Sequence, residues 1–292
     1  MPIIKKQIAI VTYQLISIII LVMVLMGACL ANSMNNNNKG VSINQSLDLL
    51  PAQEADLAKR ANSGDSDAAF KLYKFYDLVQ LDREKGIYWL TKAAEEGHVG
   101  AQYNLGYLYI YDERYKDLEK AKYWLKKAAP SSGMACSVLA NAYSKGYFGM
   151  KDFAAARSYF ILGAGEGNRM CWQKLAEYLH AGIGGKKDDS KAYYWISLEA
   201  RCVDPRSIGG KETWQLREEI AQNLPLAELE KQWRRVDKYI QLVRSKKVAV
   251  YSSAFLEGEV KKETSDEGVK LADEREKEHR NALQRNKKVT KE

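Results

Sequence analysis

The feature that most constrains the fold of this chain is a repeat of about 35 residues in its middle third. Four short segments align on an aromatic residue that stands three positions after a small residue, or four positions in the third unit. These aromatic residues are Trp89, Trp124, Phe160 and Trp195, and they lie 35, 36 and 35 residues apart. A fixed period of this length is typical of stacked supersecondary units. The sequence therefore predicts a repeat array.

Each unit has the apolar spacing of two antiparallel helices. In the second unit, Ala101, Leu105 and Leu108 share one helical face, and Trp124 and Ala128 share another. Small residues allow two helices to approach closely, and the aromatic residue then fills the wedge between neighbouring units. Because one hairpin cannot bury its apolar face alone, we expect four hairpins to stack into an all-α, right-handed superhelical solenoid.

The repeat pattern resembles the Sel-one-like repeat (SLR) family, which is related to the tetratricopeptide repeat. The second unit carries the pattern most fully, at Gly97, Ala101, Leu105, Gly106, Lys120, Ala121, Trp124, Ala128 and Ala129. The resemblance extends over roughly residues 57–202. It implies a non-catalytic adaptor or scaffold that binds other proteins.

Composition fits this architecture. Apolar residues make up 46% of the 292 residues and only five are proline, which excludes a disordered chain or a multi-pass membrane protein and favours long helices. The net charge of +8 is modest and not gathered into one stripe, so we do not expect nucleic acid as a partner.

The chain is predicted to divide into five parts. These are a signal peptide or membrane anchor (1–28), a flexible tether (29–55), the repeat solenoid (56–202), capping helices (203–256) and a charged tail (257–292). The cap is indicated by Leu229, Trp233, Val236 and Ile240, whose spacing is that of an amphipathic helix. The tail has ten basic and ten acidic residues, which predicts disorder or a lone helix.

The N-terminus predicts export. Lys5 and Lys6 precede a long apolar run, which is the layout of a secretory signal. Residues 26–29 (Met-Gly-Ala-Cys) resemble a bacterial lipobox, which implies lipidation of Cys29 and favours an outer-membrane lipoprotein. A retained inner-membrane anchor and a secreted body are the alternatives. All three place the folded part in the periplasm.

No motif for catalysis, metal or cofactor binding is apparent. The three histidines do not cluster at metal-ligand spacing, and no cysteine has a histidine base nearby in the repeat pattern. Cys171 begins the first helix of the fourth unit and Cys202 follows the second, so a disulfide between them is one possibility and two buried thiols are the other.

Tyrosine is the informative excess, with eighteen residues, and Tyr103, Tyr107 and Tyr111 stand four apart in the second unit. Transferring the groove positions of tetratricopeptide repeats predicts a partner-binding groove that holds these three. The other predicted groove residues are Phe70, Lys74, Asn141, Lys145, Gln173, Glu177 and His180. Alternatively, several of the tyrosines pack between helices.

Two classes of function remain open at this point. Binding another protein as an envelope-tethered adaptor or scaffold is favoured. An alternative within the same class is an immunity protein that neutralises a toxin delivered to the periplasm. An enzyme acting on the cell wall or on β-lactams, an activity proposed for some relatives, is disfavoured because the sequence offers no set of nucleophile, base and oxyanion donors.

Overall fold

The computed structural model describes residues 49–244 and 266–289, and every regular element in these residues is helical. The predicted all-α repeat fold is therefore confirmed. The predicted signal or anchor segment, Cys29 and most of the predicted tether lie outside the described residues. Within the described part of the chain, no helix is both long and apolar enough to cross a bilayer.

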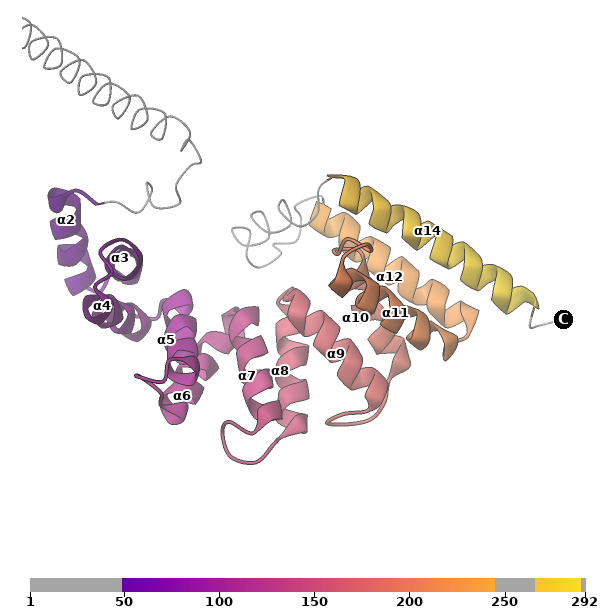
Figure 1. Ribbon diagram of the computed structural model, residues 1–292, viewed down its shortest axis with the longest axis horizontal. Coiled ribbons are helices and arrows are strands. Elements are labelled where there is room, and N and C mark those ends of the chain that lie inside the picture. Colours follow the sequence, from indigo (N-terminus) through magenta and orange to yellow (C-terminus); the bar gives the residue numbers. More distant parts are fainter. Residues whose placement is uncertain (1–48, 245–265, 290–292) are drawn as a thin grey trace, which may run out of the picture.

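The helices form consecutive hairpins along a curved array (Figure 1). The four repeat hairpins are α3 (Ser66–Lys74) with α4 (Arg83–Glu95), α5 (Val99–Tyr111) with α6 (Leu118–Ala128), α7 (Gly133–Lys145) with α8 (Phe153–Gly165), and α9 (Arg169–Ala181) with α10 (Asp189–Ala200). They are flanked by α2 (Pro51–Asn62) on one side and by α11 (Ile208–Gln222), α12 (Leu226–Arg244) and α14 (Asp266–Val289) on the other.

A polar cap begins every repeat helix. The second helices start after Asp82, Asp117, Asp152 and Asp188, and each carboxylate accepts a hydrogen bond from the backbone N–H three residues later. The first helices start in the same way after Asp65, His98, Ser132 and Asn168. Since these residues recur at the repeat period, the caps fix where each helix begins in every unit.

We expect the Asp152→Ala variant to lose about 1 kcal/mol of unfolding free energy, because the backbone N–H of Ala155 would lose its 2.8 Å bond to the Asp152 carboxylate. Urea denaturation measures this loss. Asp152→Asn is the matched control, since asparagine also caps helices and should retain most of the stability. An equal loss in both variants would show that the charge of Asp152 matters and its capping bond does not.

A glycine makes the turn that precedes the first helix in three of the four units. Gly97 and Gly167 have φ of +89° and +77°, in the left-handed region that favours glycine, and Gly64 behaves alike. In the third unit the glycine is replaced by Ser131. There a short 3₁₀ helix, Ala129–Ser131, makes the connection instead.

The core confirms the close packing expected from the small residues. Ala68, Ala101, Ala135 and Cys171, which open the first helices, have no exposed surface. Trp124 belongs to the same apolar cluster as the first unit, whereas the adjacent Leu125 belongs to the cluster shared with the third unit. The tryptophan thus packs across the boundary between units, as the wedge model requires.

One position links the second and third units to the units that follow them, and the sequence analysis did not identify it. It follows the small residue of the second helix and holds Ile87, Lys122, Arg157 and Tyr193. Lys122 Nζ lies 5.6 Å from the centre of the Phe148 ring, and Arg157 donates to the carbonyl of Lys186, each in the following unit. In the last repeat no further unit follows, so Tyr193 contacts the cap.

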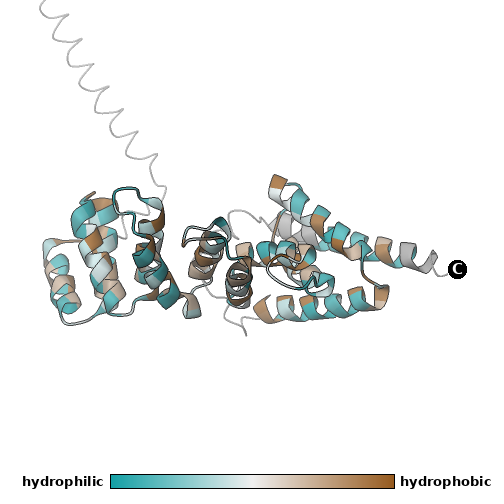
Figure 2. Cartoon of the chain, turned by 90° about the horizontal axis from the view of Figure 1, so that it is seen from below, coloured by the Kyte–Doolittle hydropathy of each residue, from teal (hydrophilic) through white to brown (hydrophobic). Residues whose placement is uncertain are grey.

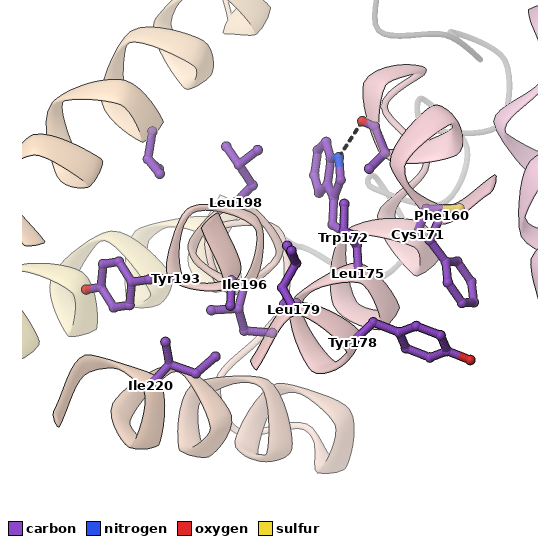
Figure 3. Packing of buried hydrophobic residues seen from close by; sticks show 14 of the residues in the cluster. Phe160, Cys171, Trp172, Leu175, Tyr178, Leu179, Tyr193, Ile196, Leu198 and Ile220 are labelled. Atoms are coloured by element: carbon purple, nitrogen blue, oxygen red, sulfur yellow. Dashed lines mark hydrogen bonds between the residues drawn. The ribbon is translucent and has the colours of Figure 1, made fainter. Parts of the chain in front are cut away.

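The cap closes the array as predicted. Leu229, Trp233, Val236 and Ile240 of α12 are buried in the cluster that also contains residues of α9 and α10. Figure 3 shows other members of this cluster, among them Trp172 of α9, Ile196 of α10 and Ile220 of α11. Apolar residues lie mainly where helices face one another, and outer surfaces are mainly hydrophilic (Figure 2). The end of the solenoid is therefore shielded from water.

The two ends of the described chain differ from expectation. Helix α2 begins at Pro51, inside the predicted tether, because Leu57 and Ala61 are buried beside α3. The predicted charged tail contains α14, which is neither disordered nor a lone helix. Its Glu276 and His279 are buried against α10 and α11, so this segment belongs to the cap.

Candidate protein-binding face

The three predicted groove tyrosines form a continuous row on one face of α5. The ring centres of Tyr103 and Tyr107 are 6.0 Å apart, and those of Tyr107 and Tyr111 are 4.5 Å apart. Tyr107 is 46% exposed and Tyr111 is 43% exposed, whereas Tyr103 is half-buried. Tyr107 and Tyr111 therefore expose aromatic surface to solvent, while Tyr103 is partly packed into the fold.

The hydroxyls of Tyr103 and Tyr111 remain protonated at neutral pH. Burial raises the pKa of Tyr103, and burial together with the nearby Tyr147 and Tyr107 raises the pKa of Tyr111. Each phenol can thus both donate and accept a hydrogen bond. Tyr147, which follows α7, extends the row and was missed by sequence reasoning. The aromatic loop residues Tyr147 and Phe148 were the available signal.

Phe70 and Lys74 are brought together on α3, but they also support the fold. The ring of Phe70 stacks on that of His98 at 4.1 Å, and Lys74 Nζ lies 5.3 Å from the centre of the Phe70 ring. His98 caps α5, because its Nδ1 accepts a hydrogen bond from the backbone N–H of Ala101. Burial lowers the pKa of His98, which favours the neutral, accepting ring.

The α7 residues lie next to the tyrosine row through Tyr147. Lys145 is exposed and its Nζ lies 5.7 Å from the centre of the Tyr147 ring, while Asn141 is half-buried one turn earlier. The ammonium group therefore adds a positive charge beside the aromatic surface.

The α9 residues have partners within the array. Glu177 pairs with Lys174 at 2.7 Å, and Gln173 is half-buried. His180 Nδ1 lies 2.6 Å from Asp189 of α10, and its Nε2 lies 3.5 Å from Glu219 of α11. These contacts give His180 a role in joining three helices, in addition to its predicted place in the groove.

Cys171 and Cys202, for which a disulfide was one possibility, are both in the thiol form in the structure. Cys171 is buried, and its Sγ lies 3.8 Å from the carbonyl oxygen of Gly133 in the preceding unit. Cys171 belongs to the apolar cluster of the last repeat and the cap, and Cys202 packs against the same cluster. Burial also raises the pKa of Cys171 and raises that of Cys136 to about 12, which makes both thiols poor nucleophiles.

Two further exposed tyrosines lie on the second helices. Tyr88 of α4 and Tyr123 of α6 are 57% and 51% exposed, and each precedes a buried wedge tryptophan. Lys127 Nζ lies 4.8 Å from the centre of the Tyr123 ring. Because these tyrosines are on different helices from the row on α5, they serve below as matched controls.

No residues of the described ranges gather into a metal site. Among residues 49–244 and 266–289, no group of three or more histidine, cysteine, aspartate or glutamate side chains is arranged to hold an ion.

Comparison with known proteins agrees with this architecture. The Sel1 repeat model matches residues 72–98, 99–129, 133–168 and 173–198, which correspond to the four hairpins. No curated protein matches the sequence.

Two solved structures are similar. One is a protective antigen of uropathogenic Escherichia coli strains that displays an SLR fold, with 26% identity, a TM-score of 0.55, and coverage of 73% of this chain and 47% of the antigen. This chain thus spans about half the length of that protein. The other is a Sel1 repeat protein from Oxalobacter formigenes, with 24% identity, a TM-score of 0.46, and coverage of 58% and 67%. Residues 72–198 of this chain thus consist of four Sel1 repeats, and the described helices have the SLR fold.

Proposed function

We propose that this protein binds another protein through the tyrosine row of α5 and acts as a non-catalytic adaptor tethered in the bacterial envelope. Sel1 repeats generally mediate protein–protein interactions and are usually non-catalytic. The observation that carries the proposal is the contiguous row of Tyr103, Tyr107 and Tyr111, which remains partly exposed although the fold has buried Ala101, Leu105, Leu108 and Ile110 of the same helix.

Tyrosine suits this role for a physical reason. It presents a large, amphipathic contact area with few rotatable bonds, so little side-chain entropy is lost on binding, and it is enriched at binding hot spots. Contact between neighbouring rings of the row further restricts the side-chain motion of the three tyrosines. Lys145 and Tyr147 extend the face towards the third unit. An aromatic face preorganised in this way favours binding to one partner segment over transient contact with many.

The tether is part of the proposal. Lipidation at Cys29 would hold the array at a periplasmic membrane surface, where an adaptor meets envelope complexes. The same placement suits an immunity protein that awaits an incoming toxin. The two roles differ in the partner: an immunity protein has one enzyme partner, which it inhibits at a stoichiometric ratio.

We expect the triple variant Tyr103→Ala, Tyr107→Ala, Tyr111→Ala to weaken partner binding by at least about tenfold, since truncating hot-spot tyrosines removes their buried contact area. The measurement is affinity capture from envelope extract with the chain from Ser33 onwards, followed by mass spectrometry and titration of the captured partner. The control variant, Tyr88→Ala with Tyr123→Ala, should bind as the parent protein does.

The outcomes separate the hypotheses. One stoichiometric enzyme, inhibited in a turnover assay and lost in the triple variant, identifies an immunity protein, whereas several envelope components identify an adaptor. Unchanged binding by a folded triple variant, or an equal loss in the Tyr88 and Tyr123 control, contradicts the proposed face.

A further inference from the structure

The helix that closes the molecule is held mainly by charged groups. The described side chains of α14 contribute only Leu283 to the neighbouring apolar cluster. Its deepest contacts are made by Glu276 and His279, which are 4% and 9% exposed. An element attached in this way responds to protonation more directly than one held by aliphatic packing.

The receiving site is built around Arg217 of α11, which has no exposed surface. Its guanidinium carbon lies 5.2 Å and 4.9 Å from the ring centres of Tyr193 and Trp214, and its Nε donates to Ser197 Oγ at 2.8 Å. The end of the array thus forms an aromatic-walled pocket with a fixed positive charge.

The carboxylate of Glu276, on α14, occupies this pocket and meets Arg217 with both of its oxygens. Arg217 Nη2 donates to Oε1 at 2.9 Å, and Nη1 lies 2.5 Å from Oε2. Burial alone would raise the pKa of Glu276, but Arg217 and Arg280 outweigh burial and lower it to about 2. Arg280 also bonds to Asp237 of α12 at 2.8 and 2.9 Å, and its guanidinium lies over the ring of Trp233.

His279 lies one turn further along α14 in a neutral state. Its Nε2 is 3.4 Å from the Tyr193 hydroxyl, its Nδ1 is 4.0 Å from Glu218 Oε1, and its ring meets that of Trp214 edge-on. The charged groups around it are Arg217 and Glu218 from α11, and Arg275, Glu276 and Arg280 from α14. From α10, the titratable group near His279 is Tyr193. From α12, Asp237 influences His279 through its hydrogen bonds with Arg280.

A cleft gives water access to this histidine. It has a volume of about 710 Å³ and opens between α11 and α14, where its lining includes Glu218, Gln222, Glu278, His279 and Leu283. Burial, followed by Arg217 and Arg280, lowers the pKa of His279 to about 3. The docked helix therefore excludes the proton that a free histidine would take up near pH 6.5.

We propose that the Arg217 pocket is a binding site for a carboxylate carried on a helix, that α14 occupies it as a latch, and that protonation of His279 releases α14. Release uncovers Tyr193, Trp214 and Trp233 together with Arg217, and so presents the end of the array to a partner that offers its own carboxylate. This inference concerns a different surface from the tyrosine row and does not depend on the proposed function.

The direction of the pH effect follows from linkage. A histidine whose pKa is lower when docked than when free weakens docking as the pH falls from about 6.5 towards 3. In this window the docking constant falls about tenfold for each pH unit, which is about 100-fold between pH 6.5 and 4.5. Glu276 contributes only about twofold at pH 4.5, because its stabilising contribution is lost mainly below its ordinary pKa of 4.5.

Hydrogen exchange of the full chain tests the latch. We expect the amides of α14 to lose about 100-fold of their protection between pH 7.5 and 4.5, after correction for intrinsic rates, while the amides of α7 keep theirs. His279→Gln, which cannot be protonated, should abolish this pH dependence.

Two more variants keep the test decisive if glutamine itself releases α14. Glu276→Gln should weaken protection of α14 at pH 7.5 yet keep the tenfold change per pH unit, whereas the exposed neighbour Glu278→Gln should behave as the parent protein. Unchanged α14 protection at pH 4.5, a pH dependence that persists in His279→Gln, or the loss of that dependence in Glu276→Gln would overturn the proposal.

Discussion

Replacing Arg217 with methionine is expected to lower the free energy of unfolding by about 3–5 kcal/mol, the range for removing one partner from a buried ion pair. Arg217 has no exposed surface, and the Glu276 side chain is 5% exposed in their ion pair. The variant would remove the Arg217 charge from the buried carboxylate and leave Arg280 as its remaining cationic partner. It would also remove the hydrogen bonds that Arg217 donates to Ser197 and Tyr193. Urea denaturation followed by circular dichroism measures the loss.

The double variant Arg217→Met, Glu276→Leu distinguishes a charge effect from a packing effect. Apolar residues of similar size can replace a buried ion pair at little or no cost, so the double variant should recover most of the lost stability. If the double variant is as unstable as the sum of the two single variants, the pair does not act as a unit and the pocket owes its stability to shape.

Gly163→Ala is expected to destabilise the protein by about 2–3 kcal/mol, although alanine is the better helix former by about 1 kcal/mol. A Cβ at this position of α8 would lie 2.5 Å from Cys171 Sγ and 2.8 Å from Cys136 Cβ. Both cysteines are fully buried, so neither can move aside without displacing α7 or α9. Steric overlap therefore outweighs helix propensity, and thermal or urea unfolding shows the sign.

A control on the same helix isolates the steric term. No atom lies within 4 Å of a Cβ built at Gly165, so Gly165→Ala should be neutral or slightly stabilising. Adding Cys171→Ala to Gly163→Ala removes the closest atom and should make the glycine replacement less costly. If Gly163→Ala and Gly165→Ala change the unfolding free energy equally, the close approach of helices at Gly163 is not the reason why glycine is required there.

The repeat fold was predictable because its determinants are local and periodic. The small residues and the aromatic wedges recur at a fixed spacing, and so do the glycine turns at Gly64, Gly97 and Gly167, where the structure has positive φ. The capping residues recur too, although their role was not recognised. Helix faces follow from spacings of three and four residues, which involve no information about distant parts of the chain.

The candidate site was predictable only in part. The tyrosine row follows from its four-residue spacing on α5, whereas the proximity of Tyr147 to Tyr111 depends on where the loop after α7 lies. His180 illustrates the limit, since its partners Asp189 and Glu219 belong to the two following helices. A position transferred from another repeat family carries no knowledge of such neighbours.

By itself, the sequence determined that this chain builds four stacked helical hairpins with a cap, because each hairpin has an apolar face that only the next unit can cover. Tertiary structure alone decided the role of the last helix. The spacing of α14 is that of a polar, charged helix, and its attachment depends on Glu276 meeting Arg217, 59 residues earlier. A buried ion pair forms only where folding brings two charges together out of water, and no local pattern in either helix specifies that meeting.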